Sequence, residues 1–136
     1  KLQAAAGELP RVHLVPKGSY SGEGEQIFSA RGGRNSALAE SGKKLRPVEM
    51  TSVDALLQGK PVDYIKMDVE GAERETLLGC RQTIAAWKPQ LSVAAYHRTG
   101  DLWELPLLVK ELCPEYRLYL RRHKYVPAWE ILLYAI

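Results

Sequence analysis

The chain lacks the features that mark several common protein classes. Its 136 residues include only two cysteines, Cys80 and Cys113, which lie far apart and have no histidine at metal-ligand spacing. Neither a disulfide framework nor a zinc site is therefore indicated. No apolar run approaches the roughly 20 residues that a membrane-spanning helix needs, and the opening does not read as a signal peptide. We expect a soluble, cytoplasmic protein with buried core thiols and no membrane partner.

An excess of charge of one sign is also missing. The 19 basic and 16 acidic residues give a net charge of +3, which is too small to predict a nucleic-acid partner. Nucleic-acid binding would rest only on the short basic cluster at residues 121–124. A G-x-G-x-x-G motif is absent as well, because the two glycines of residues 21–25 (SGEGE) have the wrong spacing for a nucleotide loop.

The composition is that of a globular domain, with 46% hydrophobic and 26% charged residues. The length predicts a single domain over residues 1–136. The chain opens with Lys1 rather than Met, and residues 2–6 read as the end of a helix already under way. We therefore expect further residues to precede Lys1 in the parent protein.

Strand and helix patterns alternate along most of the chain. Strands are predicted at residues 11–16, 25–30, 45–51, 62–67 and 91–96, and helices at residues 53–57, 71–78, 84–87 and 105–112. Ser52 is expected to cap the first of these helices, and Pro106 to occupy the first turn of the last. Residues 116–120 and 130–135 should form an antiparallel pair. The pattern predicts the α/β class, with a mostly parallel sheet and an antiparallel C-terminal hairpin.

Ligands of open α/β sheets bind outside the carboxyl ends of the strands. Lys17, Gly18 and Ser19 follow one predicted strand, and Asp68 and Glu70 follow another. The two carboxylates could hold a ligand hydroxyl, an amine or a metal. The alternative interpretation is that Asp68 only caps the following helix and that Glu70 and Glu73 are ordinary first-turn acids.

A third group of candidates follows the strand at residues 91–96. His97 has a side chain whose reference pKa of about 6.5 suits proton transfer, although a histidine in a loop is also commonly just solvated. Tyr96, with Trp103 and Trp129, would either line an acceptor pocket or belong to the core or rim.

The sequence IKMDVEGAE at residues 65–73 resembles the hallmark element of the FkbM family of S-adenosylmethionine-dependent methyltransferases. The resemblance continues through residues 96–106 (YHRTGDLWELP), 118–123 (LYLRRH) and 130–135 (EILLYA), and it covers about the last ninety residues well. Upstream, residues 12–21 and 48–57 resemble the family more loosely. The family's first strands, with the Gly-rich turn and the ribose-binding acid, have no counterpart, so the chain looks like the C-terminal portion of such an enzyme.

The resemblance implies a Rossmann-like methyltransferase sheet whose first strands are missing. It implies S-adenosylmethionine as cofactor, with Asp68 and Glu70 beside its methionine part and Lys17, Gly18 and Ser19 near its adenine. His97 would be the base on an acceptor hydroxyl, and Tyr96, Arg122 and His123 would contact a small-molecule or glycan acceptor. No metal is expected.

The missing strands would leave a gap in the middle of the sheet. Unpaired strand edges are costly and adhesive, so either the parent protein is longer or the chain closes the gap by rearrangement or forms homo-oligomers through its open edges. Two functions follow from these alternatives: O-methyl transfer by a longer parent, or a non-catalytic α/β module that works by self-association or partner binding.

Overall fold

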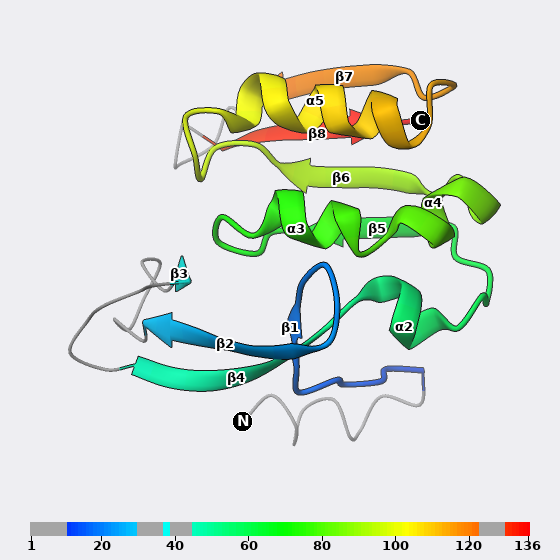
Figure 1. The fold of residues 1–136 in the computed structure, drawn as a ribbon. Coiled ribbons are helices and arrows are strands. Elements are labelled where there is room, and N and C mark those ends of the chain that lie inside the picture. Colours follow the sequence, from blue (N-terminus) through cyan, green and yellow to red (C-terminus); the bar gives the residue numbers. More distant parts are fainter. Residues whose placement is uncertain (1–10, 30–36, 39–44, 123–129) are drawn as a thin grey trace.

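The computed structural model describes residues 11–29, 37–38, 45–122 and 130–136 (Figure 1). Along these ranges the elements are β1 (Gly18–Ser19), β2 (Gly24–Ser29), β3 (Ala37–Leu38), β4 (Leu45–Thr51), α2 (Val53–Leu57), β5 (Tyr64–Met67), α3 (Glu73–Leu78), α4 (Arg81–Trp87), β6 (Gln90–Ala94), α5 (Asp101–Leu112), β7 (Leu118–Arg122) and β8 (Ile131–Ala135). The predicted α/β class is confirmed.

The strands form two four-stranded sheets, in the orders β1-β4-β2-β3 and β5-β6-β8-β7. In the described ranges, β1 pairs in parallel with β4 and β5 with β6, and the other ladders are antiparallel. The prediction of a mostly parallel sheet is therefore wrong, whereas the antiparallel pair of β7 and β8 is confirmed. The reason lies in the connections: α3 and α4 carry the chain back between β5 and β6, but only four residues reverse it between β1 and β2.

The expected strand at residues 11–16 is also wrong. That segment has no regular structure, and Val12, Leu14 and Val15 are each 40% exposed or more. The strand begins after Pro16, at Gly18, where the chain meets β4. Apolar residues alone cannot make a strand without a partner to accept their backbone hydrogen bonds.

Helix α5 begins four residues before the expected start. Its first residue, Asp101, is buried and accepts a hydrogen bond from the backbone N–H of Arg98 at 2.7 Å. Pro106 is the sixth helical residue instead of lying in the first turn. Because a proline ring lacks an N–H, only one bond of the helical ladder is lost there. The shorter helix α2 has the expected N-cap, because the Ser52 side chain accepts from the N–H of Ala55 at 3.1 Å.

The main hydrophobic core lies between the sheet of β5, β6 and β8 and the helices α3, α4 and α5, and α3 and α5 cover one face of that sheet (Figure 1). Both cysteines are buried in it, as predicted. The Cys80 thiol donates to the backbone carbonyl of Thr76 at 3.0 Å. Burial, and secondarily the charge of Asp54, raises the pKa of this thiol to about 12.

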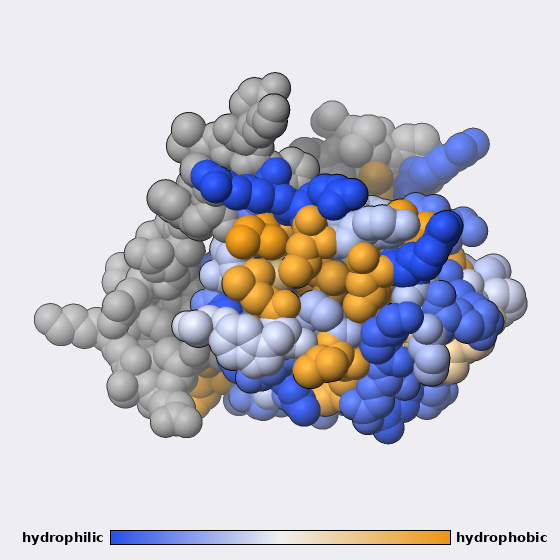
Figure 2. Space-filling model, turned by 90° about the horizontal axis from the view of Figure 1, so that it is seen from above, coloured by the Kyte–Doolittle hydropathy of each residue, from blue (hydrophilic) through white to orange (hydrophobic). Residues whose placement is uncertain are grey.

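Large hydrophobic side chains remain exposed on α5 and β7. Leu107 is 68% exposed and Leu120 is 44% exposed. Figure 2 views the molecule from the side of the β7 edge and shows hydrophobic surface bordered by strongly hydrophilic residues there. Among the described residues, no helix has both the length and the apolar character needed to cross a membrane.

The register of the second sheet brings three strand ends to one edge. Met67 of β5 is paired with Val93 of β6, which is paired with Leu133 of β8, and Leu133 is in turn paired with Leu120 of β7. Since β7 is antiparallel to β8, and β8 is antiparallel to β6, strands β5, β6 and β7 all end on the same side. The segments that follow β5 and β6 form the candidate site.

Candidate functional site

The turn after β5 presents two carboxylates to solvent. Asp68 and Glu70 have side chains 41% and 39% exposed. Helix α3 begins later, with Ala72 as an N-cap that makes no side-chain cap bond. The interpretation of Asp68 as a helix cap is therefore wrong, and its carboxylate does not cap α3.

The same turn depends on unusual backbone angles. Glu70 and Gly71 have φ values of 54° and 95°, in a region that residues other than glycine rarely adopt. A Cβ atom at Gly71 would lie 3.3 Å from the side-chain Nε of Arg98. Glycine at this position thus allows both the left-handed turn and the close approach of the loop after β6.

His97 lies at the centre of the carboxylates. Its Nδ1 is 2.7 Å from Oε1 of Glu73, and its Nε2 is 3.6 Å from Oδ1 of Asp68 and 3.6 Å from Oε2 of Glu70. The His97 side chain is only 12% exposed. The predicted juxtaposition of Asp68, Glu70 and His97 is therefore present in the structure, and His97 is not a solvated loop residue.

Tyr96 packs beside this histidine. The two ring centroids are 4.3 Å apart, and the Tyr96 hydroxyl donates to Oδ1 of Asp68 at 3.2 Å. Burial, together with the charge of Asp68, raises the pKa of Tyr96 to about 12. The phenol is therefore protonated near neutral pH and acts as a donor, which leaves His97 as the group suited to accept a proton.

Ligand atoms of Asp68, Glu73 and His97 all lie within 4.8 Å of one another. Such a group has the side-chain types that bind metal ions. However, Oε1 of Glu73 already accepts from the backbone N–H of Val69 at 3.0 Å and contacts His97 Nδ1. The Glu73 side chain is 1% exposed. Its Oε1 is therefore already occupied by contacts inside the protein.

The residues predicted to bind adenine lie in the other sheet. Gly18 and Ser19 form β1, and Lys17 makes an ion pair with Glu49 at 3.5 Å. The Ser19 carbonyl accepts from the Thr76 hydroxyl at 3.1 Å, which ties β1 to α3. In the described part of the chain, no hydrogen bond or ion pair joins these three residues to the carboxylates after β5. Their role in binding stays a prediction.

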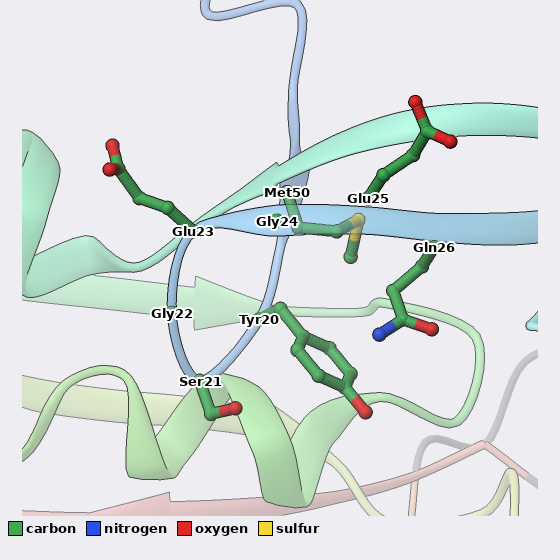
Figure 3. A pocket seen from close by; sticks show the side chains of 8 residues that line it. All are labelled: Tyr20, Ser21, Gly22, Glu23, Gly24, Glu25, Gln26 and Met50. Atoms are coloured by element: carbon green, nitrogen blue, oxygen red, sulfur yellow. The ribbon is translucent and has the colours of Figure 1, made fainter.

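A small pocket follows β1 directly. It has a volume of about 160 Å³ and is lined by Tyr20, Ser21, Gly22, Glu23, Gly24, Glu25, Gln26 and Met50. In Figure 3 the Tyr20 ring and the Gln26 amide lie on one side of the segment, and the carboxylates of Glu23 and Glu25 point to the other. The glycine-containing stretch, which lacks the spacing of a nucleotide loop, thus lines a small open pocket.

The predicted acceptor-binding residues lie in different parts of the chain relative to the site. Tyr96 is in the site, and Arg122 ends β7 at the same edge of the sheet, paired with Ile131. His123 lies outside the described residues, as does Trp129. Trp103 is 54% exposed on α5.

Sequence reasoning missed two acidic residues. Glu73 was considered as a member of the acidic cluster in IKMDVEGAE or as a first-turn acid of a helix, without a role of its own, yet it is buried and contacts His97. Glu130 precedes β8 and is close enough for its charge to contribute to the raised pKa of Tyr96. Nothing in the spacing of either residue distinguishes it from a solvated acid, so only the packing reveals its place.

The model of the methyltransferase FkbM domain matches residues 5–127. The chain belongs to the FkbM methyltransferase family. The resemblance inferred from IKMDVEGAE is thus confirmed, and the carboxylates of this FkbM domain sit in that element. A comparison with curated protein sequences found no match.

A solved structure, the methyltransferase FkbM from Methylobacillus flagellatus KT, is similar to this FkbM domain with a TM-score of 0.74 at 24% sequence identity. The alignment covers 99% of the present chain and 32% of the other. The chain therefore spans about a third of the length of that protein, and the likeness concerns the fold.

Proposed function

We propose that this FkbM domain contributes to an S-adenosylmethionine-dependent methyltransferase that methylates a hydroxyl group of a small molecule or glycan. The observation that supports this most directly is the position of His97. Its Nε2 lies between two partly exposed carboxylates at the strand ends, 3.6 Å from each. A histidine in this position can accept a proton from a hydroxyl that is held by the neighbouring acids.

The charges of the site suit the cofactor. Asp68 and Glu70 present negative charge at the crevice, where a sulfonium or an ammonium group would be attracted. S-adenosylmethionine, when bound, would supply an electrophilic methyl group for transfer from its sulfur to the acceptor oxygen. Asp68 and Glu70 would hold the positively charged part of the cofactor.

The protein's own part in the reaction is orientation and proton removal. The acceptor hydroxyl would donate toward His97, and its proton would pass to Nε2 as the oxygen is methylated. General base catalysis of this kind is worth about 10²–10⁴-fold in rate. Tyr96 holds Asp68 in place through its hydroxyl and remains protonated, because its pKa is raised to about 12.

The acceptor class follows from the groups at the edge. Carboxylates accept hydrogen bonds from hydroxyls, and the Arg122 end of β7 lies on the same side of the sheet. A polyhydroxylated acceptor, as in a glycan, would be recognised by such a mixture of acids and a base.

Calorimetric titration with S-adenosylmethionine, with S-adenosylhomocysteine as comparator, tests the proposal. Because the homocysteine form lacks the sulfonium charge, it should bind more weakly to a site that contains two carboxylates. Glu70→Gln should narrow this difference, whereas Glu75→Gln, on the next helix, should leave it unchanged. Absence of heat with both ligands would count against cofactor binding by this chain.

A second candidate is a non-catalytic module that self-associates. It is favoured by β7, an edge strand whose outer side is not paired in the described residues, and by the exposed side chains of Leu107 and Leu120. Exposed edges pair readily with a second copy. Sedimentation analysis of the wild type and of Leu120→Lys distinguishes the candidates, because the added charge should dissociate an oligomer formed through β7.

A further inference from the structure

Glu73 is a buried carboxylate with a fixed orientation. It is 1% exposed, and its Oε1 accepts from the backbone N–H of Val69 at 3.0 Å. A carboxylate removed from water is stable only when hydrogen-bond donors replace its hydration. The other polar atom within reach is Nδ1 of His97, at 2.7 Å from the same oxygen.

The Val69 contact decides which way the His97 contact is polarised. A backbone N–H can only donate, so Oε1 of Glu73 is an acceptor, and an ionised carboxylate accepts at every oxygen. Nδ1 of His97 must then carry a hydrogen. In a neutral imidazole the other nitrogen, Nε2, therefore holds the lone pair. The opposite tautomer would require a protonated Glu73.

The ring has contacts on several sides that hold it in this position. The Tyr96 ring packs against it at a centroid distance of 4.3 Å. A Cβ atom at Gly71 would lie 3.8 Å from Cβ of His97, so the turn after β5 approaches the residue from another side. With Nδ1 held by Glu73, the ring directs Nε2 toward Asp68 and Glu70.

We infer that Glu73 is a positioning residue, which fixes the Nδ1–H tautomer of His97 and holds Nε2 toward the crevice as the proton acceptor. The inference rests on the proposed function for the use of Nε2, but the tautomer itself is independent of any reaction. A carboxylate that orients a histidine in this way stabilises the correct tautomer and the imidazolium that forms when Nε2 takes a proton. Glu73 acts through His97 and does not touch the acceptor.

Nuclear magnetic resonance of the chain labelled with ¹⁵N-histidine measures the tautomer directly. Long-range ¹H–¹⁵N spectra, recorded above the pH at which the His97 signals stop changing, should show a protonated Nδ1 and an unprotonated Nε2. A His97→Gln sample assigns the signals among the three histidines of the chain. A wild-type His97 with its hydrogen on Nε2 would overturn the inference.

Three variants separate positioning from general structure. Glu73→Met removes the acceptor and should move His97 toward the Nε2–H tautomer. Glu73→Gln keeps an acceptor oxygen that the Val69 N–H holds in place, so it should retain the Nδ1–H tautomer. Glu75→Met is the matched control, because Glu75 pairs with Arg74 and not with His97. An unchanged tautomer in folded Glu73→Met would refute the role of Glu73.

Kinetics of the methyl transfer in a protein that contains this domain adds a readout that distinguishes the two proposals. Glu73→Met should lower kcat by about 10²–10⁴-fold with little change in KM, and Glu73→Gln should recover part of the loss. The Nδ1–H tautomer in a protein without methyl-transfer activity would leave Glu73 as the positioning residue and would refute only the proposed reaction. Should Glu73→Met not fold, the wild-type and Glu73→Gln spectra still decide the tautomer.

Discussion

Alkaline pH should destabilise the domain through the thiol of Cys80. This side chain is fully buried, and its pKa is raised from 9.0 to about 12. A group whose pKa is higher in the folded state stabilises the fold below its unfolded pKa, and this contribution is lost as pH rises toward the folded pKa. Because one pKa unit corresponds to about 1.4 kcal/mol, the wild type should lose about 3 kcal/mol between pH 8 and pH 11 from this thiol.

Urea unfolding at pH 8, 9, 10 and 11 measures this loss. Cys80→Ala should be less stable than the wild type at pH 8, because truncation leaves a cavity. The stability difference should then shrink by about 3 kcal/mol by pH 11. Cys113→Ala controls for the cost of truncating a buried thiol at neutral pH. A stability difference between wild type and Cys80→Ala that stays constant across this range would show that the Cys80 thiol does not titrate as its burial requires.

Three further substitutions have defined outcomes. Asp68→Ala should abolish methyl transfer in the parent protein yet cost less than about 1 kcal/mol of stability, because the side chain is 41% exposed; retained activity at normal stability would remove Asp68 from the mechanism. Asp54→Ala should lower the unfolding free energy by about 1–2 kcal/mol, since its carboxylate accepts from two N–H groups in the first turn of α4 and from the Thr83 hydroxyl. Gly71→Ala should cost about 1–2 kcal/mol because of its φ of 95°, whereas Gly22→Ala, with no atom near its Cβ position, should be neutral in the same thermal unfolding assay.

Local signals predicted most of the elements in the second half of the chain. The Ser52 cap and the alternation of strand and helix after residue 62 are set by nearby residues. The pairing of the strands was harder to predict from the sequence. Whether β2 runs parallel or antiparallel to β4 depends on the short reversal after β1 and on contacts between segments far apart in sequence, and no local pattern contains that information.

The candidate site was predictable in part for a physical reason. Because strands β5 and β6 pair in parallel, their carboxyl ends meet at one edge, and the residues that follow them had to converge. This rule predicted that Asp68 and His97 would be neighbours, and they are. The rule does not say how deep each side chain lies, which is why the burial of Glu73 and the proximity of Glu130 were not foreseen.

The burial of Glu73 links the position of His97 to the packing of β5, β6 and α3. Its carboxylate needs both the Val69 N–H from the turn after β5 and the His97 ring from the loop after β6. Loss of either contact would leave the buried Glu73 carboxylate partly unsatisfied. Complete removal of one partner of a buried charge pair costs about 3–5 kcal/mol. His97 can therefore be oriented only when β5 and β6 are paired and α3 has begun at Glu73. The base is thus positioned by the same contacts that close the β5–α3 turn, so a substitution that loosens this turn should disturb His97 before it unfolds the domain.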